Sequence, residues 1–296
     1  MKGILGATEL VVGRFGLGTA TFGREAGREE AFAILDHARA RGVNFFVLAE
    51  AYSQGAAEEI FGAWLKDRGR NPEDVIASKF SGGKSAPAIV AACEASLKRL
   101  GVDGLDLYQW HSWDAATPLG EILTALDTLR RQGKIRHGGI SNLSAGQLRE
   151  VRVEEDAMGF RVVGALELRH SLADRGIEEE LVPLARREGL GIATYGPLAS
   201  GFLTGKYRRG ENLPEGTRFA IAPAHQNLYF QDSCWAALDR LRAVSARAGC
   251  TPAQLAIAWA VNRSEGDCIL IGGRNAAQIE QWFSAEEIDA AWIDAL

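Results

Sequence analysis

The sequence predicts an α/β protein built as a closed (β/α)8 barrel. Short apolar segments alternate with longer amphipathic ones along the chain, which is typical of repeated βα units around a parallel sheet. Eight such units fit into 296 residues, close to the roughly 250 residues that a barrel of this kind needs. Residues 15–23 read FGLGTATFG and not G-x-G-x-x-G, which counts against an open, doubly wound dinucleotide-binding sheet.

Each expected strand leads into an expected helix or into a connection that contains one. The short apolar segments predict strands at residues 15–18, 44–49, 75–79, 105–110, 134–141, 162–168, 191–195 and 267–272. Apolar residues at helical spacing predict helices at residues 28–41, 57–66, 87–100, 119–132, 144–151 and 177–188, with two more that begin at 251 and 276. Ser144 fits an N-cap, and Pro87 and Pro252 fit the first turn of a helix, where a missing N–H costs nothing.

One long connection interrupts this order. Residues 199–232 follow the seventh expected strand and are rich in Gly, Pro and Asn. Long irregular connections in compact domains are usually functional, so we expect a lid over a ligand here. No internal repeat or linker divides the rest, and the chain is expected to form one domain over residues 1–296.

Composition narrows the class of partner and the location. A net charge of −5 offers no basic face for phosphates, which counts against a nucleic-acid partner. No apolar run reaches about 18 residues, and the amino-terminal segment lacks the unbroken apolar core of a signal peptide, so neither a membrane span nor a leader is expected. The four cysteines are scattered and the histidines lack metal-ligand spacing, which predicts reduced thiols, no metal site and a cytoplasmic location. Arginine far outnumbers lysine, a bias associated with GC-rich bacterial genomes.

Chemically active side chains fall at the carboxyl ends of neighbouring expected strands, which is where a barrel of this kind carries its active site. Tyr52 follows the second strand, Lys79 ends the third, and His111 follows the fourth. A lysine ammonium beside a phenol favours the phenolate, and an imidazole can orient a carbonyl group or share a proton. These three residues therefore predict a proton-transfer group at the barrel mouth.

The chain resembles the aldo-keto reductases nearly from end to end. The matching segments include FGLGTATFG (15–23), VIASKF (75–80), SLKRLGVDGLDLYQWH (96–111), GKIRHGGISN (133–142), YGPLASGFLTGKY (195–207) and ILIGGRN (269–275). The resemblance implies a TIM barrel whose base is closed by an N-terminal hairpin, here residues 2–12. It also implies the reduction of aldehydes and ketones by NADPH bound across the barrel mouth.

The resemblance implies a role for each matching position. Tyr52 would donate the proton to the carbonyl oxygen, Lys79 would favour the phenolate, and His111 would orient the carbonyl. The positions expected to hold NADPH or NADP⁺ are Gly18, Thr19, Ser141, Asn142, Glu167, Tyr195, Gly196, Leu198, Gly201, Lys206, Gly272, Arg274 and Gln278. The positions expected to line the substrate pocket are Phe22, Val47, Trp110 and Trp113.

The chain also departs from the family pattern. The family reads Asp-Thr-Ala after its second strand, whereas this chain has Val47, Leu48 and Ala49, so the aspartate that pairs with the lysine is absent. The family's glutamine on the sixth strand is Glu167, which as a carboxylate can accept but not donate hydrogen bonds. The asparagine near the adenine corresponds to Trp282.

Three functions remain open on these observations. In the first, the protein reduces a carbonyl group with NADPH through an altered tetrad, and Glu50 or Glu167 replaces the missing charge. In the second, the barrel performs dehydration, isomerisation or cyclisation, and a neutral Lys79 acts as a base or Schiff-base nucleophile. The third is a nucleotide-binding protein without catalysis. The retained Tyr52, Lys79 and His111 favour the first, and the aromatic residues near the mouth favour a bulky or ring-containing carbonyl substrate. Nothing in the pattern indicates an oligomeric state.

Overall fold

The computed structural model describes residues 2–82, 85–221, 223, 226–263 and 265–296. Its centre is a closed parallel barrel in the order β10-β3-β4-β5-β6-β7-β8-β9, which confirms the predicted (β/α)8 class. The strands are β3 (Phe15–Gly18), β4 (Phe45–Val47), β5 (Val75–Phe80), β6 (Leu105–Trp110), β7 (Ile135–Ser141), β8 (Val163–Arg169), β9 (Gly191–Tyr195) and β10 (Cys268–Ile271).

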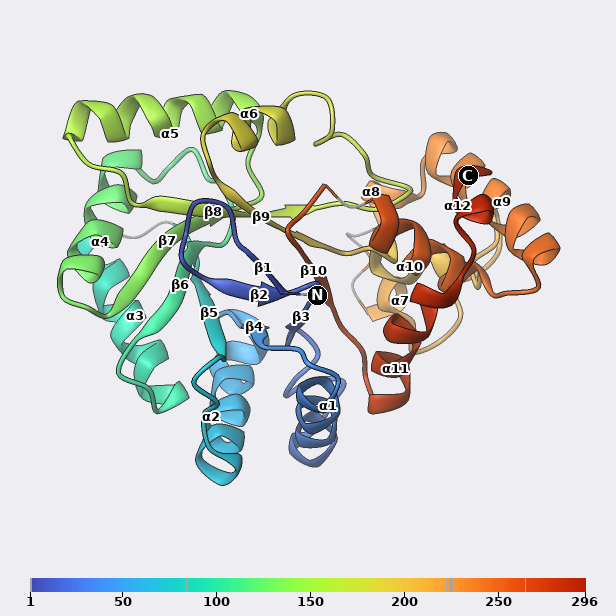
Figure 1. Ribbon diagram of the computed structural model, residues 1–296, viewed down its shortest axis with the longest axis horizontal. Coiled ribbons are helices and arrows are strands. Elements are labelled where there is room, and N and C mark those ends of the chain that lie inside the picture. Colours follow the sequence, from blue (N-terminus) through green and yellow to red (C-terminus); the bar gives the residue numbers. More distant parts are fainter. Residues whose placement is uncertain (1, 83–84, 222, 224–225, 264) are drawn as a thin grey trace.

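Helices surround the barrel, and the last third of the chain gathers on one side of it (Figure 1). The helices that follow strands are α1 (Arg28–Ala40), α2 (Ala56–Arg68), α3 (Ala86–Leu100), α4 (Leu119–Arg131), α5 (Ala145–Met158), α6 (Leu181–Arg187), α10 (Pro252–Arg263) and α11 (Ala276–Ser284). The additional ones are α7 (Arg218–Ile221), α8 (Gln226–Tyr229), α9 (Asp232–Ala248) and α12 (Ala290–Asp294). Ser144 caps α5 as predicted, because its hydroxyl accepts a hydrogen bond from the backbone N–H of Gln147.

The barrel interior is apolar over most of its depth. Side chains that alternate along the strands point inward, among them Phe45, Val47, Ala77, Leu107 and Leu270. The hairpin of β1 (Lys2–Ile4) and β2 (Val11–Gly13) closes one end, and its loop and strand contribute Leu5, Leu10 and Val12 to the same cluster. This end therefore serves as a packed plug, which leaves the carboxyl ends of the strands for chemistry.

Two elements differ from the pattern-based expectation. α5 continues to Met158 instead of ending near residue 151, because Arg152 and Glu155 are buried as an ion pair on the face that meets the barrel. Glu155 also accepts hydrogen bonds from the backbone N–H groups of Val162 and Val163, so its burial leaves no uncompensated charge. α9 was not predicted at all, although it buries Trp235, Leu238 and Leu241 at helical spacing.

The long connection after β9 is partly helical and packs on itself. It contains the 3-10 segment Ala199–Thr204 together with α7 and α8. Phe202 lies at the centre of an aromatic cluster, with ring centroids 4.8 Å from Trp235 and 5.7 Å from Phe230. This segment is therefore held in place by its own apolar contacts.

Backbone strain is concentrated at the carboxyl end of the barrel. Among the described residues, the non-glycine residues with positive φ are Ser53, Gln54, Asn142, Ala199 and Ser200. All of them lie in the connections that follow β4, β7 and β9. Such conformations cost about 1–3 kcal/mol each and persist where the surrounding structure requires them, most often near functional sites.

Candidate active site

Lys79 and Tyr52 meet at the carboxyl end of the barrel. Lys79 is an inward-facing residue of β5 and is fully buried, and Tyr52 opens the short 3-10 turn Tyr52–Gly55 after β4. The Lys79 Nζ lies 3.3 Å from the Tyr52 Oη and 3.3 Å from the carbonyl oxygen of Leu48. The structure thus joins two of the three residues expected to transfer a proton.

Glu167 forms an ion pair with the buried lysine. Its Oε1 lies 3.1 Å from the Lys79 Nζ, and both side chains are buried. Burial on its own would lower the pKa of Lys79, but the charge of Glu167 and the contact with Tyr52 outweigh burial and raise that pKa. Lys79 is therefore an ammonium ion in the folded protein.

The second carboxylate oxygen of Glu167 is in a different situation. Glu167 Oε2 is buried, and within the described residues it has no hydrogen-bond partner. Burial raises the pKa of Glu167, and Lys79 opposes that shift. A buried carboxylate oxygen that accepts no hydrogen bond is costly, so this atom is a position where a donor from a ligand would be favourable.

Val47 faces the same interior from β4. It is 1% exposed and belongs to the apolar cluster inside the barrel, in register with Ala77 of β5. Lys79 consequently receives its negative charge from β8 and not from β4. Glu50, the other candidate from the sequence, accepts a hydrogen bond from the backbone N–H of Ser81 at 2.8 Å.

His111 lies beside the phenol. The centroids of its ring and that of Tyr52 are 5.7 Å apart, and the rings meet edge to face. Burial, together with the positive charge of Lys79, lowers the pKa of His111 from 6.5 to about 4. The imidazole is therefore neutral near pH 7 and can donate a hydrogen bond from one ring nitrogen.

The ends of β7, β8 and β9 are tied together by a polar network. Tyr195 Oη donates to Asn142 Oδ1 at 2.6 Å, and Asn142 Nδ2 donates to the carbonyl oxygen of His111 at 3.0 Å. Ser141 Oγ donates to the carbonyl oxygen of Glu167 at 3.0 Å, and the Asn142 N–H donates to the same oxygen at 3.1 Å. Asn142 reaches these partners with φ 58°, a left-handed conformation that asparagine tolerates better than most residues. Ser141, Asn142 and Tyr195 thus form a polar surface beside Lys79 and Glu167, and we call this surface the floor of the site.

A group of cations gathers where the connection after β9 meets the loop after β10. We call Arg24, Lys206, Arg218 and Arg274 the cationic cluster. Burial, with Arg274 nearby, lowers the pKa of Lys206, and burial, with Arg24 and Arg274 nearby, lowers the pKa of Arg218. Glu25 contacts both Arg24 and Arg218. Cations gathered this closely favour an added anion at this place.

Sequence reasoning identified half of the cationic cluster. Lys206 and Arg274 were expected near a cofactor, and the Arg274 N–H donates to Gln278 Oε1 at 2.9 Å as part of the same loop. Arg24 and Arg218 were missed because they come from the loop after β3 and from α7, which the sequence separates widely. The sequence marks Arg24 and Arg218 only as arginines in connections that follow strand ends, which does not show that they lie near Lys206 and Arg274.

The other positions that the resemblance assigns to a cofactor mostly shape the loops around the mouth. Thr19 is buried and its hydroxyl donates to the carbonyl oxygen of Val47 at 3.1 Å, directly after Gly18 at the end of β3. Gly196 and Gly201 have φ values of 72° and 87°, which suit glycine, and Leu198 lies partly buried between them. The carbonyl oxygen of Gly272 accepts a hydrogen bond from Trp282 Nε1 at 3.3 Å.

The aromatic residues expected near the mouth are largely buried. Trp110 and Phe22 are fully buried and belong to the larger apolar cluster. Strand alternation explains Trp110, because Leu107 faces the interior and Trp110 therefore points to the other side of β6. Trp113 is partly buried and packs on Trp110 with ring centroids 4.9 Å apart.

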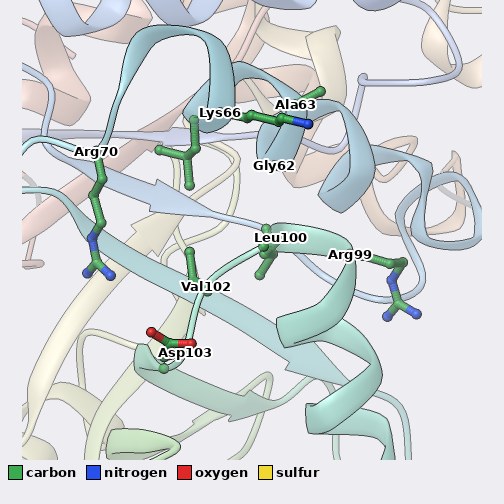
Figure 2. A pocket seen from close by; sticks show the side chains of 11 residues that line it. Gly62, Ala63, Lys66, Arg70, Arg99, Leu100, Val102 and Asp103 are labelled. Atoms are coloured by element: carbon green, nitrogen blue, oxygen red, sulfur yellow. The ribbon is translucent and has the colours of Figure 1, made fainter.

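A separate hollow lies away from this site. It has a volume of about 590 Å³ and opens between the carboxyl ends of α2 and α3, where Lys66, Arg70 and Asp103 surround it (Figure 2). The chain passes from here into the amino-terminal end of β6, so the hollow lies at the opposite end of the barrel from Tyr52 and Lys79. It takes no part in the site described above.

The described residues contain neither a metal-ligand cluster nor a membrane-spanning helix. No group of three or more His, Cys, Asp or Glu side chains is placed to hold a metal ion. No helix in the described part of the chain is both long and apolar enough to cross a bilayer.

A closed parallel barrel with tyrosine, lysine and histidine joined at its carboxyl end defines the class of aldo-keto reductase-like barrels. The chain belongs to the aldo/keto reductase family, whose sequence profile matches residues 14–294. It is similar to a probable voltage-gated potassium channel subunit beta of Arabidopsis thaliana, with 33% identity over 96% of this chain and 90% of the relative. A protein of the same description from Oryza sativa subsp. japonica is 34% identical over the same shares.

The lowered pKa of His111 predicts a neutral ring over the physiological range. The free residue titrates near 6.5 and the folded one near 4, so between these values the folded state binds fewer protons than the unfolded state. The contribution of His111 to stability is therefore complete above pH 6.5 and is lost as the pH falls toward 4. Ring ¹⁵N NMR of the labelled protein, assigned with His111→Gln, should show a neutral imidazole at pH 5.5. A charged ring at that pH would contradict the burial described here.

Proposed function

We propose that the protein is an NADPH-dependent carbonyl reductase in which Glu167 performs the electrostatic task of the missing aspartate. The observation that carries this proposal is the buried ion pair between Lys79 and Glu167, 3.1 Å apart, beside the Tyr52 hydroxyl. The family membership supports the reaction class, and the retained residues support proton transfer.

The proposed reaction places the substrate carbonyl between Tyr52 and His111. When bound, NADPH supplies the hydride that reaches the carbonyl carbon. Tyr52 gives its phenolic proton to the carbonyl oxygen, and the C=O bond becomes a C–OH bond. Lys79, 3.3 Å from the phenol oxygen, stabilises the phenolate that remains until solvent reprotonates it. The neutral His111 donates a hydrogen bond to the oxygen and holds it in line.

Two features of the chain suit the proposed cofactor. The buried Oε2 of Glu167, which has no hydrogen-bond partner among the described residues, is an acceptor on β8 at the level of Ser141 on β7, and a carboxamide NH₂ is a donor of matching kind. The cationic cluster favours a phosphate group, and arginine recognises phosphates through paired N–H donors. Residues at these two places would hold the nicotinamide end and the adenosine 2′-phosphate end, respectively.

The ion pair also bears on the alternative without hydride transfer. That alternative needs Lys79 as a neutral amine, either as a base or as a Schiff-base nucleophile. The charge of Glu167 keeps Lys79 protonated. The Nζ of Lys79 also already contacts Glu167, Tyr52 and the carbonyl oxygen of Leu48. The reductase is therefore the better supported of the two enzymatic functions.

The proposed substrate is a small-molecule aldehyde or ketone whose carbonyl group carries a bulky or ring-containing substituent. Tyr52, Tyr195 and Trp113 are partly buried aromatic residues in or after strands β4, β9 and β6, and aromatic surfaces favour apolar rings. We further propose a cytoplasmic location, in keeping with free cysteines at positions 93, 234, 250 and 268.

Replacing Tyr52 by Phe tests the proton-transfer step. The change removes the phenolic proton and keeps the ring, so kcat/KM for carbonyl reduction should fall at least about 100-fold. The rate would be followed by the oxidation of NADPH with a panel of aromatic aldehydes and ketones. The affinity for NADPH, measured by calorimetry, should stay within about twofold of the parent. A variant that keeps full activity would overturn the assignment of Tyr52.

A swap of carboxylates tests the role of Glu167. Glu167→Gln leaves the buried Lys79 without a counter-charge and should lower kcat/KM at least about tenfold. The double variant Val47→Asp/Glu167→Gln returns a carboxylate to the barrel interior from β4 and should recover most of that loss. If Glu167→Gln reduces carbonyls as fast as the parent, the ion pair does not support the reaction.

The cationic cluster predicts a preference for the phosphorylated dinucleotide. Arg218→Ala removes one cation of the cluster and should weaken NADPH binding at least about tenfold, while NADH binding changes little. Arg209→Ala is the matched control, because Arg209 lies in the same connection and is also paired with a carboxylate, but its ion pair with Asp232 is exposed and lies outside the cationic cluster. Equal losses for NADPH and NADH would show that Arg218 does not contact the 2′-phosphate.

A further inference from the structure

We propose that Glu167 makes the site favour the oxidised cofactor, NADP⁺, over NADPH. This inference rests on the proposed function, because it assumes that the nicotinamide occupies the floor formed by Ser141, Asn142 and Tyr195. It adds a property that neither the family membership nor the proposed reaction requires. It is based on the orientation of the buried ion pair, in which Lys79 on β5 is the positive end and Glu167 on β8 is the negative end.

The positive end of the pair lies toward the phenol. Lys79 Nζ contacts Tyr52 Oη and the carbonyl oxygen of Leu48, and both of these belong to the connection after β4. Lys79 Nζ therefore directs its donors to the proton-transfer side of the site and to one oxygen of Glu167.

The negative end lies toward the proposed nicotinamide floor. The backbone oxygen of Glu167 accepts hydrogen bonds from Ser141 Oγ and the Asn142 N–H, and Asn142 is joined to Tyr195. Glu167 also stands in register with Ser141 of β7 and Ala193 of β9, so its carboxylate approaches Lys79 from that side of the barrel. Its Oε2 takes up no hydrogen bond within the described residues. Oε2 is therefore available to a ligand, whereas Oε1 is engaged with Lys79.

The two oxidation states of the cofactor differ in charge at the ring. The nicotinamide ring of NADP⁺ carries a positive charge that is absent from NADPH. A carboxylate in a buried setting attracts that charge more strongly than it would in water, because the surroundings screen it less. A neutral amide at position 167 would contact both forms alike. Val47 on β4 places no carboxylate on the opposite side, so the negative charge is displaced toward the ring.

Separate titrations of NADP⁺ and NADPH into the purified full-length protein test this inference. Tryptophan fluorescence and calorimetry would give both dissociation constants for the parent and for Glu167→Gln. The substitution should reduce the preference for NADP⁺ at least about tenfold, mainly through weaker NADP⁺ binding. For a two-electron couple, a tenfold change in that ratio raises the potential of the bound cofactor by about 30 mV.

Two further variants separate the position of the charge from its amount. Val47→Asp/Glu167→Gln keeps the net charge of the parent and gives Lys79 a partner on β4, so it should retain the reduced preference of Glu167→Gln and serves if the single variant folds poorly. Glu50→Gln removes a carboxylate whose Oε1 accepts from Ser81, and the preference should remain within about twofold of the parent. A parent-like ratio in the double variant, or a large change in Glu50→Gln, would overturn the inference.

The outcomes also separate this inference from the proposed function. If the parent binds neither form up to about a millimolar, the proposed cofactor site is wrong and the inference falls with it. If the parent binds both forms and Glu167→Gln changes neither ratio nor affinity, the inference alone is wrong.

Discussion

The ion pair between Lys79 and Glu167 is the interaction on which the site depends. A lysine that is fully buried inside an apolar barrel loses several kcal/mol of hydration, and this cost is met only by a close counter-charge and further acceptors. Glu167, Tyr52 and the carbonyl oxygen of Leu48 supply them together. Because the counter-charge comes from β8, position 47 on β4 is free to carry an apolar valine within the interior cluster. The same pair influences its neighbours, since the charge of Lys79 helps to keep His111 neutral.

The barrel divides stability and chemistry between its two ends. One end is closed by the hairpin and filled by Leu5, Leu10 and Val12, and it contributes apolar burial. The other end carries hydrogen-bond networks, buried charges and the positive-φ residues that follow β4, β7 and β9. Strained and charged groups are tolerated there because the strands beneath them hold their positions. The cationic cluster is assembled at the same end from loops that are distant in sequence.

Much of the fold and part of the site follow from local patterns. Apolar periodicity predicts the order of strands and helices, and placement at strand ends predicts that Tyr52, Lys79 and His111 come together. Apolar periodicity predicts the end of α5 wrongly. The charged Arg152 and Glu155 look like surface residues, so the predicted helix ends before them, but they are buried as an ion pair and α5 continues through them. Residue type alone also does not show that strand alternation turns the ring of Trp110 away from the barrel interior. Arg218 has no local signal, because its neighbours come from separate loops.

The sequence by itself determined that a valine stands at position 47, where the family resemblance implies an aspartate, and that a glutamate stands on the sixth barrel strand. It left open whether Glu50 or Glu167 provides the charge for Lys79, because both follow or lie in strands whose carboxyl ends face the same mouth. Only the tertiary structure decided for Glu167. Barrel closure places β8 across the interior from β5, and the side chain of Glu167 on β8 reaches Lys79 on β5. Glu50 lies beyond the end of β4 and accepts a hydrogen bond from the backbone N–H of Ser81. A charge pair across a barrel depends on strand register and closure, and neither is encoded in any short stretch of sequence.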